Sequence, residues 1–284
     1  MKGCFKINNL GLIFIGANCP NLEILNLHSC WDISSQGLLT LAEGCPKLRS
    51  IDLSNCRKID SVGVIALLDS SQIEEIILSY CKSLNNDLYK DPFLFSNLKR
   101  INLQRCTTIT DVGYRHLEGH QLELEYLVLS DCSFLTDASI SIICKSCPNL
   151  KALSVSFVCG LTEKCVDSLI SLTELETLDV SFCGNLMTNI ALEQVGKCLA
   201  LKRLGIRGCF KVGQQFMIDY LDRSTTIECL NVSQCKNLQL DYLKRNYSNI
   251  KFLEIENVID EDPSSKFLTN SRYPIGTRQR TKTI

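Results

Sequence analysis

Cysteine is the residue type in this chain most able to do chemistry, since 17 of the 284 residues are cysteines. Cys144-Lys-Ser-Cys147 has the spacing of half a zinc site or of a redox pair. A zinc site would need a second pair of ligands, and a cysteine nucleophile would need a nearby base. No second pair has suitable spacing, and the histidines His28, His116 and His120 are not near this motif in the sequence. We therefore expect no metal, no cofactor and no catalytic site, so that the chain is not an enzyme.

The positions of the cysteines indicate a structural repeat. Nine of them recur at intervals of 25 or 26 residues, with one interval of 51 in which Val158 takes the missing place. A fixed period of this length is typical of a solenoid built from stacked repeats. These nine residues, which we call the repeat cysteines, are Cys4, Cys30, Cys56, Cys81, Cys106, Cys132, Cys183, Cys209 and Cys235.

Each complete repeat has the pattern Leu-x-x-Leu-x-Leu-x-x-Cys, as in the run from Leu22 to Cys30. The alternating leucines predict a short strand with one buried face. A pair such as Thr110 and Asp111 then offers an oxygen to cap a helix, and Cys-Pro pairs predict where several helices stop. One such unit cannot bury its own apolar face. We therefore predict an α/β leucine-rich-repeat solenoid, a right-handed horseshoe with a parallel concave sheet and convex helices.

The segment Ile109-Thr110-Asp111-Val112-Gly113, with the strand pattern that follows its helix, resembles the cysteine-containing leucine-rich repeats of the F-box/LRR proteins. The resemblance covers residues 1 to about 258. It implies that the horseshoe recognises the substrate of an SCF-type (Skp–cullin–F-box) E3 ubiquitin ligase, which promotes ubiquitin-dependent protein degradation. The F-box itself is not present in this chain. The resemblance therefore implies that a Skp-type adaptor and a cullin bind only through an F-box outside it.

The repeats also predict the domain limits. Cys4 matches Cys30 but has no strand before it, so we expect an incomplete N-terminal repeat in a fragment of a longer protein. The cysteine-containing leucine-rich-repeat domain is assigned to residues 1–258, and a C-terminal tail to residues 259–284. Between residues 263 and 284 there are five basic residues and no acidic one. The tail is expected to be disordered, with folding back over the concave face as the alternative.

Charge and hydropathy restrict the classes of partner. The chain has 30 Lys and Arg against 31 Asp and Glu, a net charge of −1, so we expect neither a nucleic-acid nor a membrane partner. The apolar stretch from Leu10 to Ala17 resembles the core of a signal peptide, but its pattern recurs downstream as ordinary helix, so we interpret it as structure. Without a secretion signal, such a cysteine-rich chain is expected in a reducing compartment, either cytoplasmic or nuclear.

The concave sheet is the surface that remains for binding a protein substrate or peptide. Ten parallel strands about 4.8 Å apart would span about 45–50 Å. Exposed aromatic and arginine side chains are the types that anchor interfaces. The alternative is that Phe157, Phe182, Tyr80 and Tyr126 only pack within the protein. The candidate partner-binding residues are Tyr80, Arg100, Gln104, Arg105, Tyr126, Phe157, Phe182, Arg203 and Arg207.

Two functions of different classes are compatible with this surface. The first is substrate recognition in an SCF-type ubiquitin ligase. The alternative is an F-box-independent protein-interaction scaffold or inhibitor that uses the same face. The type of repeat favours the first, and the absence of an F-box from the chain is the main argument against it. The coding sequence upstream of Met1 would separate the two, since an F-box there would establish the ligase role.

Overall fold

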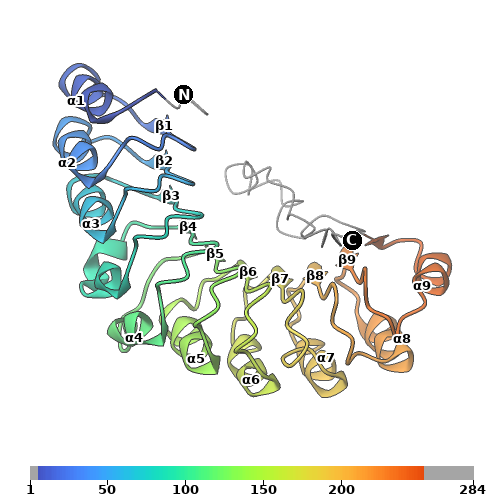
Figure 1. Ribbon diagram of the computed structural model, residues 1–284. Helices are drawn as coiled ribbons and strands as arrows, with labels where there is room; N and C mark the ends of the chain where they lie inside the picture. Colours follow the sequence, from blue (N-terminus) through green and yellow to red (C-terminus); the bar gives the residue numbers. More distant parts are fainter. Residues whose placement is uncertain (1–5, 253–284) are drawn as a thin grey trace, which may run out of the picture.

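One continuous parallel sheet is the central feature of the computed structural model, which describes residues 6–252. The ten strands of this part of the chain pair in sequence order, so each repeat adds one strand beside the last. Figure 1 shows the strands along the inner side of a horseshoe and the helices along its outer side. The predicted α/β leucine-rich-repeat solenoid is confirmed. The strands are β1 Ile24–Asn26, β2 Ser50–Asp52, β3 Glu75–Ile77, β4 Arg100–Asn102, β5 Tyr126–Val128, β6 Ala152–Ser154, β7 Thr177–Asp179, β8 Arg203–Gly205, β9 Cys229–Asn231 and β10 Lys251–Phe252.

Helical segments connect the strands on the convex side. Three ten-residue helices end directly before a Cys-Pro pair, at Asn18, Gly44 and Ser146, because proline cannot continue a helix. The α-helices are α1 Asn9–Asn18, α2 Ser35–Gly44, α3 Ser61–Ser70, α4 Asp111–Tyr114, α5 Asp137–Ser146, α6 Val166–Leu169, α7 Asn189–Val195, α8 Gln214–Arg223 and α9 Leu240–Asn246. The 3-10 helices are η1 Asn86–Tyr89, η2 Pro92–Phe95, η3 Arg115–Leu117 and η4 Glu163–Cys165.

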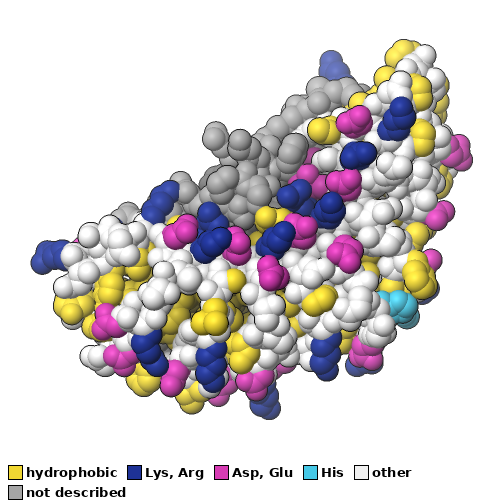
Figure 2. All heavy atoms as spheres, turned by 180° about the vertical axis from the view of Figure 1, so that it is seen from behind, with side chains coloured by type: hydrophobic (Ala, Val, Ile, Leu, Met, Phe, Trp, Pro, Cys, Tyr) yellow, Lys and Arg dark blue, Asp and Glu magenta, His cyan; other side chains and the backbone are white. Residues whose placement is uncertain are grey.

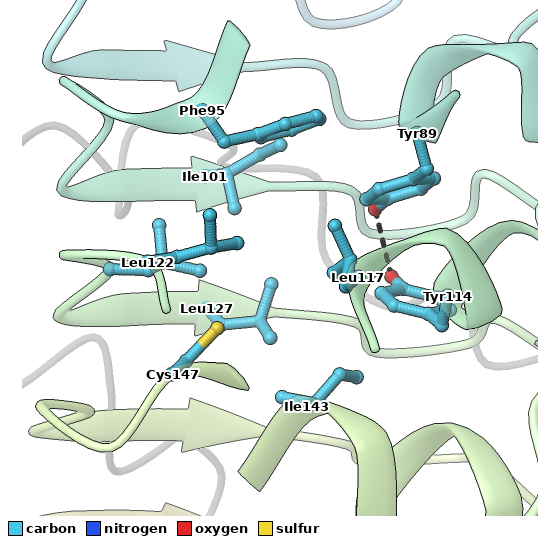
Figure 3. Close-up of a pocket in the computed structure, with 10 residues that line it drawn as sticks. Tyr89, Phe95, Ile101, Tyr114, Leu117, Leu122, Leu127, Ile143 and Cys147 are labelled. Atoms are coloured by element: carbon cyan, nitrogen blue, oxygen red, sulfur yellow. Dashed lines mark hydrogen bonds between the residues drawn. The ribbon is translucent and has the colours of Figure 1, made fainter. Parts of the chain in front are cut away.

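The repeat between β3 and β4 departs from the expected single helix. Two 3-10 helices replace it, because Pro92 has no N–H to continue an α-helix through this segment. Aromatic side chains fill the space beneath. The rings of Tyr89 and Phe95 stack with centroids 5.3 Å apart, and the Tyr89 hydroxyl donates to that of Tyr114 at 3.0 Å. A cavity of about 20 Å³ with an apolar lining remains beside them (Figure 3).

Side chains at the helix starts link each repeat to the next. Thr110 caps α4 by accepting a hydrogen bond from the N–H two residues on, as its Thr-Asp pair predicts. The aspartate of that pair has a second role. Asp111 accepts hydrogen bonds from the backbone N–H of Thr136 at 3.0 Å and from its hydroxyl at 2.7 Å. Asp137 and Thr162 repeat this arrangement one unit further on, so the caps join neighbouring helices in a chain.

A tight turn ends each of the strands β1 to β9, and its third residue has a left-handed backbone. At this position φ lies between +59° and +68°, even where the residue is bulky, as it is at Tyr80, Arg105, Phe157 and Phe182. Positive φ at the third position is the pattern of a type II turn, which favours Gly or Asn. A bulky residue there costs roughly 1–3 kcal/mol. The amide of the turn residue still bonds across the sheet, as when Tyr80 donates to the Gln104 carbonyl at 2.8 Å.

The repeat cysteines follow these turns and hold neighbouring repeats together. The Leu27 carbonyl accepts the Cys30 N–H at 3.0 Å, and the thiol of Cys56 in the next repeat donates to the same oxygen at 3.2 Å. A buried carbonyl thereby uses both of its lone pairs. Burial raises the pKa of the Cys81 and Cys132 thiols to about 12, so they keep the proton that they donate. Equivalent contacts of 3.0–3.5 Å come from Cys81, Cys106, Cys132, Cys183, Cys209 and Cys235.

Val158 stands where the cysteine is missing, and the turn keeps its shape. Its N–H donates to the Val155 carbonyl at 3.2 Å, and the preceding Phe157 has a φ of +62°. Valine is buried as the cysteines are, but it has no proton to donate to the Leu129 carbonyl of the preceding repeat. The thiol therefore strengthens the contact between repeats, whereas the turn forms without it.

A single apolar core runs through the repeats from α1 to Ile250. The stretch interpreted as structure, from Leu10 to Ala17, lies within helix α1. Cys4, the domain boundary at residue 258 and the tail at 259–284 lie outside the described residues. The incomplete first repeat and the state of the tail therefore stay predictions.

Replacing Cys106 by alanine should lower the free energy of unfolding by about 1–2 kcal/mol, because it opens a small cavity and removes a donor from the Leu78 carbonyl. Urea denaturation followed by circular dichroism would measure this. Cys159→Ala, at an exposed cysteine, is the matched control and should change the free energy by less than about 0.5 kcal/mol. Equal effects of the two substitutions would show that the thiol contact does not stabilise the solenoid.

Candidate functional site

The nine predicted partner-binding residues occupy three positions of the repeat, all on or beside the concave face. One set lies in the strands, directly before the middle apolar residue; a second follows the strands in a column otherwise dominated by serine; a third takes the left-handed turn position. The sheet register therefore brings residues far apart in sequence into neighbouring repeats. In that order the sets are Arg100, Tyr126 and Arg203; Gln104 and Arg207; and Tyr80, Arg105, Phe157 and Phe182.

Several of these side chains stack on one another across neighbouring repeats. The guanidinium carbon of Arg100 lies 4.7 Å from the centre of the Tyr126 ring. The guanidinium carbon of Arg105 lies 5.0 Å from the centre of the Tyr80 ring, and Arg105 Nε pairs with Asp131 Oδ2 at 2.5 Å. Such contacts between cations and rings restrict the side chains to defined positions.

Phe157 and Phe182 form a second stack further along the horseshoe. Their ring centroids are 4.3 Å apart, and the guanidinium carbon of Arg207 lies 5.3 Å from the centre of the Phe182 ring. Both phenylalanines are half-buried and stand apart from the main core, so they do not turn inward as the alternative prediction supposed. The left-handed turn directs them along the edge of the sheet instead.

Tyr126 is not the exposed anchor that we predicted. Only 7% of its surface is exposed, and it packs with Val128 and Ala152 in an apolar cluster separate from the main core. Strands about 4.8 Å apart on a concave surface bring such side chains into mutual contact. Gln104 is half-buried just after β4, the strand next to β5, and Arg203 is half-buried on β8, two strands beyond β6.

Sequence reasoning missed an acidic residue beside Arg100. Glu75 lies directly opposite Arg100 on the neighbouring strand, yet the described residues show no ion pair between them, because Arg100 turns over the Tyr126 ring. The Ser50 hydroxyl donates to Glu75 Oε2 at 3.3 Å. Glu75 Oε1 and Arg100 Nε are buried without a hydrogen-bond partner in this part of the chain. Burial raises the pKa of Glu75, although the charge of Arg100 opposes the shift.

A second buried carboxyl group lies on the other side of the apolar cluster. Asp179 in β7 is fully buried; its Oδ1 accepts the Ser181 N–H at 3.0 Å. Its Oδ2 has no hydrogen-bond partner among residues 6–252, and neither has the hydroxyl of Thr177 on the same strand. Burial raises the pKa of Asp179, while hydrogen bonds from Ser181 and the charge of Arg207 oppose the shift. The charged form is therefore disfavoured unless a donor or a cation reaches it.

These residues occupy concave-side positions on the strands β3, β4, β5 and β7, and we call them the concave site. It has an apolar centre and a buried carboxyl group on either side. The signal that could have found the two acids is their position in the repeat, since both occupy strand positions that the register assigns to the concave side. The concave site consists of Glu75, Arg100, Tyr126, Val128, Thr177 and Asp179.

The edge where the strands begin has a different chemistry. The residue two positions before the middle of each strand alternates in charge from repeat to repeat. Ion pairs join neighbours, with N–O distances of 3.4 Å for Arg49 and Glu74 and 2.9 Å for Lys202 and Glu176. Figure 2 shows basic and acidic side chains interspersed over the visible face. Such an edge offers little net field to a partner of one sign. This charge row is Glu23, Arg49, Glu74, Lys99, Glu125, Lys151, Glu176, Lys202 and Glu228.

The cysteine motif considered for chemistry is buried. Burial raises the pKa of Cys144 and of Cys147 to about 12, so both are protonated at neutral pH. Within residues 6–252 there is no group of three or more His, Cys, Asp or Glu residues placed to hold a metal ion. In the same range no helix combines the length and the apolar character needed to cross a membrane.

Comparison with known proteins identifies the repeats. Residues 18–42 and 44–68 match a family model described as leucine-rich repeat. The chain is 34% identical to F-box/LRR-repeat protein 23 of Arabidopsis thaliana over 125 residues, 41% of this chain and 27% of that protein. It is also 34% identical to F-box protein SKIP19 of the same plant over 119 residues, 41% of this chain and 38% of that protein. The chain thus spans well under half the length of these relatives.

An internalin from Listeria monocytogenes has a similar structure, with a TM-score of 0.56, 19% identity, and coverage of 87% of this chain and 63% of the internalin. At this identity the likeness concerns the fold alone. The chain has the fold of a leucine-rich-repeat solenoid, and two of its repeats match the leucine-rich-repeat model. In sequence it is similar to an F-box/LRR-repeat protein and to a second F-box protein, as the cysteine pattern indicated.

Asp179→Asn should stabilise the protein at pH 7, by roughly 1–3 kcal/mol, because it removes a buried negative charge whose Oδ2 has no hydrogen-bond partner among residues 6–252 and keeps the acceptor for Ser181. Folding raises the pKa of Asp179, so its carboxyl group lowers the free energy of unfolding of the protein as the pH rises above about 3.9, the pKa of an aspartate in the unfolded chain. The gain should therefore shrink towards pH 4. Urea denaturation at both pH values would test this, with Asp167→Asn at an exposed helix position as control. A gain that is equal at the two pH values would contradict it.

Proposed function

We propose that this chain is the substrate-recognition part of an SCF-type E3 ubiquitin ligase, and that its concave face holds the protein to be ubiquitinated. The observation that carries the proposal is the sequence relationship of its repeats to two proteins named for an F-box. A Skp-type adaptor and a cullin would bind through an F-box outside this chain. The protein would act in the cytoplasm or the nucleus and promote ubiquitin-dependent degradation.

The chemistry of the concave face supports binding without covalent catalysis. The thiols of the repeat cysteines in the core are held protonated by burial, as for Cys81 and Cys132, so they are poor nucleophiles. The aromatic and arginine side chains are instead prearranged in stacks, which reduces the entropy lost when a partner orders them. The chain's contribution to ubiquitination would then be to position the substrate, while other subunits perform the transfer.

Affinity purification of the full-length protein that contains this chain should recover a Skp-type adaptor and a cullin. Mass spectrometry of the eluate would measure both, with the isolated 284-residue chain as the control that should recover neither. Recovery of partners without adaptor or cullin would contradict the ligase role. That outcome would favour an F-box-independent scaffold or inhibitor, which uses the same surface.

Replacing Tyr126 and Arg203 together by alanine should weaken binding of a recovered substrate by at least tenfold, because it opens the apolar cluster of the concave face and removes a half-buried arginine, a residue type that anchors interfaces. Binding would be measured by surface plasmon resonance after a thermal melt has established folding. Arg203→Glu alone provides a version that leaves the apolar cluster intact. Tyr242→Ala with Arg223→Ala, on the convex helices, is the control. Full binding by both concave variants would rule out this face.

A further inference from the structure

The concave site contains polar groups without hydrogen-bond partners in the described part of the chain, and their positions indicate the chemistry of a ligand. Glu75 and Asp179 flank the apolar centre, and each carries a buried carboxylate oxygen with no hydrogen-bond partner among the described residues. Between them, Arg100 Nε is a buried donor in the same state, and the Thr177 hydroxyl lies beside Asp179. A ligand that brings two cationic groups, an apolar group, a carbonyl and an N–H would satisfy them all.

The strand spacing sets the distances between these groups. Glu75 lies on β3 and Asp179 on β7, four strands further along the sheet. At about 4.8 Å per strand the separation is roughly 19 Å, and the shift of two residues along the strand makes the diagonal roughly 20 Å. The apolar centre at Tyr126 and Val128 on β5 lies midway, about 10 Å from either carboxyl group.

A polyproline II segment fits these distances. It rises about 3.1 Å per residue with three residues per turn, so residues three apart point to the same side and lie about 9 Å apart. Six residues then span about 19 Å, and flexible basic side chains cover the remaining difference. An extended β-strand places residues three apart on opposite faces. An α-helix would need about 13 residues for the same span.

We propose that the concave site binds a polyproline II segment of a partner protein with the pattern basic–x–x–apolar–x–x–basic. The two basic side chains pair with Glu75 and Asp179, and the apolar side chain lies on Tyr126 and Val128. The polyproline II backbone makes no internal hydrogen bonds. Its carbonyl and N–H groups are therefore free to pair with Arg100 Nε and the Thr177 hydroxyl. This inference rests on the proposed function of the same face as a substrate-binding surface.

The experiment uses the full 284-residue chain and a fluorescein-labelled peptide containing Arg-Pro-Ser-Leu-Pro-Ser-Arg, followed by fluorescence anisotropy. Three control peptides replace both arginines by glutamate, replace the leucine by serine, or shorten the arginine spacing by two residues. We expect the first peptide to bind at least tenfold more tightly than each control. Equal binding of the arginine and glutamate peptides would overturn the proposal.

Variants of the protein locate the binding. Glu75→Gln and Asp179→Asn should each weaken the binding of the peptide by about tenfold, because each variant loses one charge-assisted contact. Asp179→Asn is expected to be the more stable protein, so its loss of binding would not reflect unfolding. Glu74→Gln, next in sequence but in the charge row, is the matched control and should leave binding unchanged. Unchanged binding by both concave variants would overturn the proposal.

A segment with the same spacing occurs in the chain itself, at Arg272, Ile275 and Arg278. A full-length variant with Arg272→Ser and Arg278→Ser tests whether this segment competes. Binding of the peptide to that variant alone would overturn the assignment to an external partner. Peptide binding with the expected dependence on Glu75 and Asp179 would stand even if no adaptor or cullin were recovered, so failure of the ligase role and of this inference are distinguishable.

Discussion

The stacking of each repeat on the next is the constraint on which the rest of this structure depends, and a hydrogen bond from a cysteine thiol to a carbonyl oxygen recurs between neighbouring repeats. The carbonyl at the end of each strand lies where the chain turns out of the sheet, so the sheet no longer satisfies it fully. The turn N–H takes one lone pair, and the thiol of the next repeat takes the other, as Cys56 does for Leu27. Cysteine suits this place because it is small and apolar and still has a proton to donate.

The stacking of the repeats permits backbone conformations that the side chains alone would not favour. Tyr80, Arg105, Phe157 and Phe182 all have positive φ, at a cost that the stacked repeats offset. The result is a row of large side chains directed along the edge of the sheet and stacked on one another, as Phe157 on Phe182. A strained backbone that tertiary packing overdetermines is a rigid support for a binding surface.

At the concave site, by contrast, polar groups without hydrogen-bond partners among residues 6–252 lower the stability of the free protein and favour the binding of a ligand. Arg100 could pair with Glu75 but lies over Tyr126, which leaves an acceptor and a donor buried without partners in the described chain. Asp179 and Thr177 are in the same condition. Such groups lower the stability of the free protein, and they become favourable when a complementary ligand reaches them. In the charge row, at the edge where the strands begin, ion pairs such as that of Arg49 with Glu74 instead neutralise the charges.

The sequence by itself determined the repeat, the strand register and the end points of several helices, because a period of 25 or 26 residues imposes the same local geometry on each unit. It also predicted which residues share the concave side. Only the tertiary structure decided that Tyr126 is buried, that two 3-10 helices replace a helix before β4, and that Glu75 is left without its arginine. The 3-10 helices follow from the break at Pro92, which the general repeat pattern does not include. The other two outcomes depend on side chains of neighbouring repeats meeting across the sheet, and no pattern within one repeat contains that information.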